Sequence, residues 1–211
     1  MNEYFISFPR SGSTLLRYLI EQITHIPTHD PNPQLVNKRS ASQWYGRPIK
    51  FEQNKPLFVK LHGWPVSQEP FRVHIHVRNY KECIEAHCRR SSKPIYYDKF
   101  IQLYADLLTK WYHHLNRGVL VFFEDLIDLQ KQPTILREVL EAFKITNYDW
   151  NFYLKNIQSL NEQSFKSYTH LYGPTEKSAD LEKRKQLDAR IMDLVGEEIY
   201  NLYLERYREK E

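Results

Sequence analysis

The chain has 211 residues, of which 27% are charged and 41% hydrophobic, and it carries a formal net charge of +4. This length and composition fit one globular domain with a core and exclude a disordered chain. The mildly basic balance suits an anionic ligand but is too weak to indicate nucleic acid by itself.

Three further features bear on where the protein works. No apolar run approaches the roughly 20 residues of a membrane span. Strand-like sequence begins within about three residues of Met1, which leaves no room for a signal peptide. The two cysteines, Cys83 and Cys88, match neither a disulfide nor a zinc-binding pattern. We therefore expect a single domain over residues 1–211 in the reducing cytoplasm, with no membrane or nucleic-acid partner.

The chain begins with a predicted strand, a tight loop and a helix. A short apolar run ends at Phe8, the loop Pro9-Arg10-Ser11-Gly12-Ser13-Thr14 follows, and apolar residues then recur at helical spacing. Such a loop suits an anion, because backbone N–H groups at a helix start point outward and Gly12 lets a ligand approach closely. An ordinary turn with a Ser or Thr N-cap is the alternative. The loop is not a Walker A motif, which needs an earlier glycine and a lysine.

Beyond this helix, short strands and helices alternate along the chain. Residues 25–55 are polar and rich in proline and asparagine, which predicts a loop with one short helical piece near Ser40–Tyr45. The run over residues 118–123 is continuously apolar, which is typical of a strand buried on both faces. Asn79 is the expected N-cap of a helix over residues 80–90. The other expected elements are strands over residues 56–62 and 71–78, and helices over residues 94–115, 133–143, 150–160 and 181–207.

This alternation predicts an α/β protein with a parallel sheet of about four or five strands and helices on both faces. Ligands of such sheets bind at the carboxyl ends of the strands. That rule brings together the loop after Phe8, Lys60 and His62 after one strand, and Arg78 after another. Arg10, Lys60 and Arg78 are then cations for an anion, and His62 is a candidate base.

The expected sheet edge offers little for a metal ion. A nucleoside triphosphatase needs an acid at a strand end to hold Mg²⁺, and here that strand ends in Arg78. The pair Glu124-Asp125 is the remaining candidate and is better explained as structural. His74 and His76 alternate on one strand, but no third ligand lies near them in sequence. The pattern therefore predicts a polyanion site that uses side-chain cations and no metal.

Four segments, in the right order over roughly residues 4–143, together resemble the PAPS-dependent sulfotransferases. Phe8–Thr14 is similar to the 5′-phosphosulfate-binding loop of that family, and residues 59–62 to its Lys-Thr-His segment. Residues 77–82 resemble its Arg-Asn-Pro-Lys-Asp segment, and residues 119–126 its strand ending in Tyr-Glu-Asp-Leu.

The resemblance implies a P-loop NTPase-like fold and transfer of a sulfuryl group from 3′-phosphoadenylyl sulfate (PAPS) to a hydroxyl or amine of a small molecule. The product would be adenosine 3′,5′-bisphosphate (PAP), and no metal would take part. His62 would act as general base, with Lys60 and Arg10 stabilising charge on the leaving phosphate. The cofactor-binding residues it implies are Arg10, Ser11, Gly12, Ser13, Thr14, Leu15, Arg78, Phe123, His87 and Arg90.

The chain departs from the family pattern at four positions, all of which concern the 3′-phosphate and the adenine. The serine expected eight residues after the phosphate-binding arginine is Ala86, for which His87, Arg89 or Arg90 would compensate. Leu15 stands where an aromatic residue often stacks on adenine, and Phe123 lacks the hydroxyl of the usual tyrosine. The late Arg-Lys-Gly segment has no clear match, and residues 170–178 occupy about its place.

Two other functions stay open at this point. One is a small kinase of the same fold using ATP, which fits less well because the Walker A lysine is missing. The other is a non-catalytic protein that binds a nucleotide or a phosphorylated ligand. The sequence does not specify the acceptor, although Trp44, Tyr45 and Trp64 lie in segments expected to frame it and favour a flat or ring-bearing molecule.

Overall fold

A four-stranded, all-parallel sheet in the order β2-β1-β3-β4 forms the centre of the computed structural model. The structure describes residues 1–28, 41–45, 50, 56–172 and 181–209, without the side chains of residues 43–44 and 165–172. The strands are β1 (Asn2–Ser7), β2 (Val59–Leu61), β3 (Phe71–Val77) and β4 (Arg117–Phe122). The predicted fold class, an α/β protein with a parallel sheet flanked by helices, is therefore confirmed.

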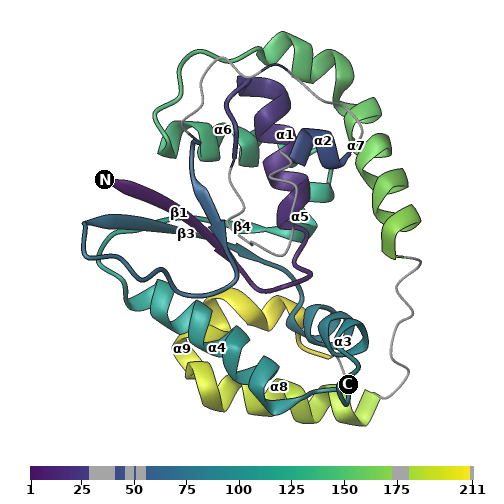
Figure 1. The fold of residues 1–211 in the computed structure, drawn as a ribbon. Coiled ribbons are helices and arrows are strands. Elements are labelled where there is room, and N and C mark those ends of the chain that lie inside the picture. Colours follow the sequence, from purple (N-terminus) through teal and green to yellow (C-terminus); the bar gives the residue numbers. More distant parts are fainter. Residues whose placement is uncertain (29–40, 46–49, 51–55, 173–180, 210–211) are drawn as a thin grey trace.

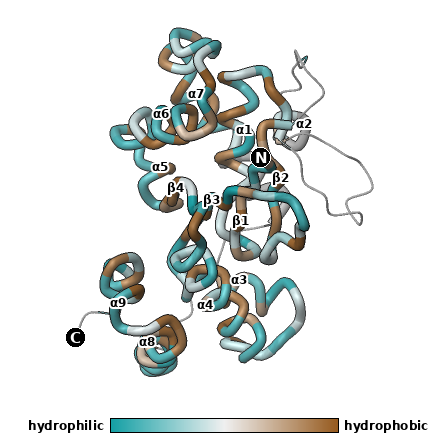
Figure 2. The backbone as a smooth tube through the Cα atoms, turned by 90° about the vertical axis from the view of Figure 1, so that its left-hand side faces the viewer, coloured by the Kyte–Doolittle hydropathy of each residue, from teal (hydrophilic) through white to brown (hydrophobic). Residues whose placement is uncertain are grey.

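Helices cover both faces of the sheet, as Figures 1 and 2 show from two directions. One face carries α1 (Ser13–Thr24), α2 (Ala41–Trp44), α5 (Phe123–Ile127), α6 (Gln132–Ala142) and α7 (Trp150–Tyr172). The other carries α3 (Tyr80–Arg90), α4 (Asp98–His113), α8 (Leu181–Val195) and α9 (Glu197–Ile199), followed by a π-helical turn (Tyr200–Leu204) and a 3₁₀ turn (Glu205–Tyr207).

Each face has its own apolar core, because neighbouring residues of a strand point to opposite sides. Phe5 packs with the α1 side and Ile6 with the α3 side, and both are at most 1% exposed. On β3, Ile75 likewise joins the α3 side. The sheet therefore separates two clusters, and the carboxyl ends of its strands lie between them.

The sequence predicted that the apolar run at residues 118–123 forms a strand buried on both faces. This prediction is wrong. The run forms β4, which lies at the edge of the sheet and pairs with β3. Within this strand Val121 is buried, whereas its neighbours are only partly covered. A central position would have needed a strand on each side, and the apolar run alone does not specify that second neighbour.

The helix predicted over residues 181–207 is interrupted at Gly196. This glycine has φ 85° and ψ 152°, a conformation that an L side chain rarely adopts and that ends α8 at Val195. The predicted helix over residues 150–160 is longer than expected, and α5 was not predicted. Cys83 and Cys88 are free thiols buried in α3. Within the described part of the chain, no helix combines the length and apolar character needed to cross a membrane.

Candidate functional site

The loop between β1 and α1 has an unusual backbone. Arg10 and Gly12 both have positive φ, 73° and 84° respectively. The loop closes through a hydrogen bond from Ser11 N–H to the carbonyl of Phe8 at 3.2 Å. A Cβ placed on Gly12 would lie 2.3 Å from Cε2 of Phe123, so the ring packs directly on the glycine. Both the backbone angle and this close approach therefore require glycine at position 12.

The loop presents donors that an anion would satisfy. Gly12 is the N-cap of α1, and having no side chain it cannot cap the amides of the first turn. The alternative of a Ser or Thr N-cap is thus wrong. Ser11 Oγ is buried and has no hydrogen-bond partner among the residues that the structure describes. Since buried hydroxyls are normally paired, the loop fits an anion better than an ordinary turn. Ser13 and Thr14 begin α1 beside it.

Lys60 and His62 lie at the carboxyl end of β2, beside β1. His62 Nδ1 is 2.8 Å from the carbonyl oxygen of Ser7. A carbonyl can only accept, so Nδ1 carries the proton and Nε2 of a neutral ring keeps its lone pair. Nε2 accepts a hydrogen bond from Nζ of Lys60, whose side chain is buried. The tautomer of His62 is therefore the one in which Nε2 can act as a base.

Arg78 follows β3 and contacts the loop. Its guanidinium donates to the carbonyl of Arg10 at 3.2 Å and to Glu82 at 2.7 Å, and it stacks over the Phe123 ring at 4.7 Å. The structure thus brings the loop, Lys60 with His62, and Arg78 to one edge of the sheet, as the sequence predicted.

Three other residues that the sequence predicted to bind the cofactor differ from one another in burial and contacts. The His87 ring contacts Phe100 and Phe8, at 4.1 and 5.5 Å between centroids. Burial, and next the charge of Arg10, lowers the pKa of His87. Arg90 is exposed at the end of α3, one turn beyond Ala86 on the same helix face. Leu15 is buried in the core beneath α1, so its side chain supports the helix instead of lining the loop.

The acidic pair after β4 is fully engaged in structural contacts. Glu124 accepts from Asn79 N–H at 3.0 Å and from the hydroxyl of Tyr207 at 2.5 Å. Asp125 binds both nitrogens of the Arg206 fork at 2.9 and 3.0 Å. Hydrogen bonds from Arg206, with a further one from Lys131, lower the pKa of Asp125 to about 2. The structural interpretation of this pair is therefore confirmed.

Sequence reasoning missed a buried polar group under the loop. His76 is 1% exposed, and within the described part of the chain neither of its ring nitrogens has a hydrogen-bond partner. Burial, with the charges of Arg78 and Lys60, lowers the pKa of His76 to about 3. Ser7, its register partner on β1, also has a buried hydroxyl without a partner. The alternation of polar residues along β3 was the sequence signal for this group.

His74, two residues earlier, is bonded differently. Its Nε2 donates to Glu3 at 2.8 Å and its Nδ1 accepts from Val119 N–H at 3.2 Å. Both ring nitrogens are used, so His74 and His76 do not form a metal-binding pair. Among the described residues, no group of three or more His, Cys, Asp or Glu is placed to hold a metal ion.

Two of the rings that were expected near an acceptor are engaged in packing. Trp64 contacts Phe71 and His114 near the amino end of β3, which is the opposite end of the strand from Arg78. Tyr45 is 4% exposed and packs on Tyr18. The Trp44 side chain, most of residues 26–55 and residues 173–178 lie outside the described residues. The expectation of a ring-bearing acceptor therefore has no support from Trp64 or Tyr45.

The chain has the P-loop-like α/β fold found in sulfotransferases. A solved structure with this fold is the crystal structure of mouse sulfotransferase SULT7A1 complexed with PAP. The two chains superpose with a TM-score of 0.54 over 95% of this chain and 87% of the mouse chain, at 15% sequence identity. No protein-family model matches the chain, and no curated protein sequence does so either. At this identity the likeness establishes the fold and nothing finer.

Proposed function

We propose that the protein is a sulfotransferase that moves a sulfuryl group from PAPS to a hydroxyl or amine of a small-molecule acceptor. The observation that carries this proposal is the arrangement of His62. The Ser7 carbonyl fixes its tautomer, and Nε2 lies against a buried lysine at the sheet edge that also holds the loop. A base and a cation side by side next to an anion-binding loop are what transfer of an anionic group requires.

The loop binds the 5′-phosphosulfate in this proposal. The amides of the first turn of α1 and the unpartnered hydroxyl of Ser11 are suitable donors for it. Ser13 and Thr14 add hydroxyls, and Arg10 adds a positive charge. The ring of Phe123 on Gly12 closes one side of the loop, next to Arg78.

PAPS supplies the sulfuryl group, and the side chains of this chain manage one proton and one developing charge. The acceptor oxygen or nitrogen forms a bond to sulfur as the bond from sulfur to the phosphate oxygen breaks. His62 Nε2 takes the proton of the acceptor, a step that contributes roughly 10²–10⁴ in rate. Lys60 leaves Nε2 and, together with Arg10, stabilises the electron pair that departs with the phosphate.

Arg78 binds the 3′-phosphate in this proposal. Its fork is suited to phosphate, and in the structure it is paired with Glu82 at 2.7 Å. A 3′-phosphate therefore competes with Glu82 for the same guanidinium. His87 and the exposed Arg90 are the proposed further contacts in place of the serine that Ala86 replaces. Leu15 has no part in this scheme, because its side chain is in the core.

A metal-dependent kinase has less support. The two acids that could hold Mg²⁺ after β4 are bound to Asn79, Tyr207, Lys131 and Arg206. Freeing Glu124 would break contacts of α5 with α3 and with the 3₁₀ turn Glu205–Tyr207, called the C-terminal turn below, and freeing Asp125 would break its contacts with Lys131 and with that turn.

The first experiment is calorimetric titration with PAP, and with ATP in the presence and absence of Mg²⁺. We expect PAP to bind without metal and Arg78→Ala to weaken it by about tenfold or more, as loss of a charged phosphate contact does. Arg137→Ala is the matched control, because that arginine stacks on Trp150, at 4.6 Å from the ring centroid, and the loss of one charge is the same. Binding of Mg-ATP alone would favour the kinase. PAP binding without sulfuryl transfer to any acceptor in a broad screen would favour the inert binder.

A further inference from the structure

The peptide group that joins Arg78 to Asn79 is held at both of its polar atoms. The carbonyl of Arg78 accepts from the hydroxyl of Tyr104 at 2.8 Å. The N–H of Asn79 donates to Glu124 at 3.0 Å. The chain leaves β3 and enters α3 at this peptide. Because a peptide group is planar and includes the Cα atom before it, fixing both polar atoms also fixes the position of the Arg78 Cα, from which the side chain leaves the backbone.

The second oxygen of Glu124 is held by the C-terminal turn. It accepts from the hydroxyl of Tyr207 at 2.5 Å, and Tyr207 is 8% exposed. Burial and the charge of Glu124 raise the pKa of Tyr207, so its hydroxyl stays a donor. Arg206 binds Asp125 with both nitrogens of its fork. Two consecutive residues of the turn thus bind two consecutive residues after β4.

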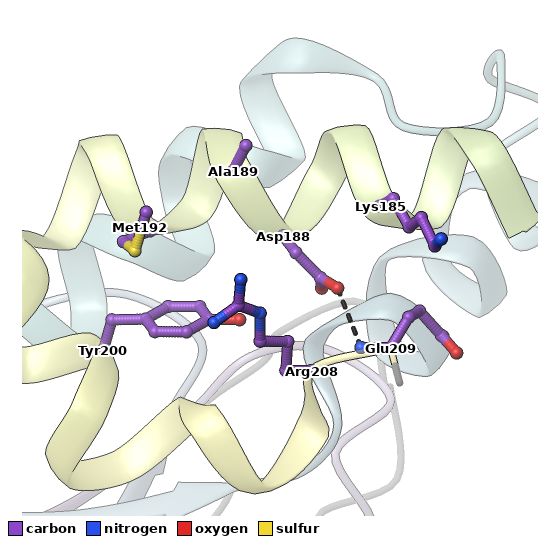
Figure 3. Close-up of a pocket in the computed structure, with 7 residues that line it drawn as sticks. All are labelled: Lys185, Asp188, Ala189, Met192, Tyr200, Arg208 and Glu209. Atoms are coloured by element: carbon purple, nitrogen blue, oxygen red, sulfur yellow. Dashed lines mark hydrogen bonds between the residues drawn. The ribbon is translucent and has the colours of Figure 1, made fainter. Parts of the chain in front are cut away.

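The other side of the turn is fixed to α3 and α8. The buried Nζ of Lys81 donates to the carbonyl of Tyr207 and pairs with Asp188 at 2.8 Å. Asp188 also accepts from the backbone N–H of Glu209 at 2.9 Å, the contact drawn in Figure 3. A cavity of about 190 Å³ separates part of this segment from α8. These polar contacts therefore hold the turn where side-chain packing is incomplete.

We propose that Tyr207 is a positioning residue for Arg78, acting through Glu124 and the Arg78–Asn79 peptide, and that Tyr104 holds the same peptide from the other side. The inference rests on the proposed function, in which Arg78 binds the 3′-phosphate. It adds a support from the C-terminal 3₁₀ turn, which contacts Arg78 only through Glu124 and the Arg78–Asn79 peptide in this scheme. The part of the ligand that depends on it is the 3′-phosphate alone.

The test compares two ligands that differ by that phosphate. Dissociation constants for PAP and for adenosine 5′-phosphate are measured by calorimetry on wild type, Tyr207→Phe and Tyr104→Phe. We expect each variant to bind PAP about tenfold more weakly and to bind adenosine 5′-phosphate as wild type does. Tyr203→Phe is the matched control, because its ring packs on Trp111 and Tyr112 in the same C-terminal segment. It should leave both constants unchanged.

The outcomes separate a positioning role from a merely structural one. If Tyr207→Phe leaves the ratio of the two dissociation constants unchanged, for example because it weakens the binding of both ligands equally, the inference is overturned. If Tyr207→Phe does not fold, Glu124→Gln replaces it, because the amide still has an oxygen for Asn79 N–H but loses the charge. A wild-type protein that binds PAP no better than adenosine 5′-phosphate refutes the 3′-phosphate role of Arg78 itself. A wild-type preference that persists in both variants refutes the inference alone.

Discussion

The two halves of the candidate site are supported by different parts of the chain. In the half formed by the loop, Lys60 and His62, the Ser7 carbonyl of β1 holds the His62 ring at Nδ1. Lys60 of β2 contacts the same ring at Nε2. In the half formed by Arg78, support comes from Tyr104, from Glu124 and, behind Glu124, from the 3₁₀ turn Glu205–Tyr207. The first half keeps a hydroxyl, Ser11 Oγ, without a partner. The comparison indicates that His62 and Arg78 are held by different contacts, although Arg78 also donates to the Arg10 carbonyl of the loop. Single substitutions should therefore affect the base and the 3′-phosphate contact to different extents.

The largest effect that separates the halves is expected for His62→Ala. Turnover should fall by roughly 10²–10⁴ because the base is lost, while PAP affinity stays within about twofold, since the Arg78 half is untouched. Steady-state rates with a competent acceptor, together with PAP titration, measure both. His113→Ala removes an exposed histidine of α4 and is the control. Parallel loss of PAP binding would mean that the two halves are not independent.

Gly12→Ala tests the loop half through its packing. The added Cβ needs positive φ and would meet the Phe123 ring at 2.3 Å, so we expect a loss of about 1–3 kcal/mol of unfolding free energy and weaker PAP binding. Gly63→Ala is the matched control, because among the described residues other than its two chain neighbours no heavy atom lies within 4 Å of a Cβ at that position. Denaturant unfolding measures both variants. Equal stability for the two would contradict the close packing of Phe123 on the loop.

The loop half was the more predictable of the two from sequence. The loop glycine and the Lys60–His62 spacing are local motifs whose chemistry lies within a few residues. In the other half, only Arg78 itself could be predicted from its place at a strand end. The contacts that support Arg78 could not be predicted, because each joins residues far apart in the sequence. The hydrogen bonds Tyr104–Arg78, Glu124–Asn79 and Tyr207–Glu124 span 26, 45 and 83 residues. Alternation predicted a parallel sheet, but the neighbours of β4 depend on sheet order, which an apolar run does not encode. The break at Gly196 had a signal, a single glycine in a helical pattern.

His76 lies beneath both halves, and its burial predicts a pH dependence of stability. Its pKa is lowered to about 3 in the folded chain, chiefly by burial, whereas the unfolded value is near 6.5. The unfolded state therefore binds more protons between these values. The contribution of neutral His76 to the free energy of unfolding is therefore complete above about pH 6.5. As the pH decreases toward 3, the free energy of unfolding falls by up to roughly 1 kcal/mol per pH unit.

His76→Val should flatten this slope in denaturant unfolding measured at several pH values. Burial also lowers the pKa of His74, so a smaller slope of the same sign should remain. His113→Ala, at an exposed position, should leave the slope as in wild type. An unchanged slope in His76→Val would mean that the ring is hydrated or paired in solution.

The smallest expected effect concerns the negative charge of Glu82, which lies beside the Arg78 guanidinium. Glu82 competes with a 3′-phosphate for the guanidinium and places a negative charge beside it. Partly exposed pairs of this kind contribute about 0.5–1 kcal/mol, so Glu82→Gln should tighten PAP binding by about two- to fivefold. The affinity for adenosine 5′-phosphate should not change, and Glu138→Gln, at an exposed position of α6, should change neither constant. Weaker PAP binding in Glu82→Gln would show that Glu82 orients Arg78 more than it competes for it. In that case the carboxylate would belong, with Tyr104 and Glu124, to the support of the arginine, and the separation between the two halves of the site would be sharper still.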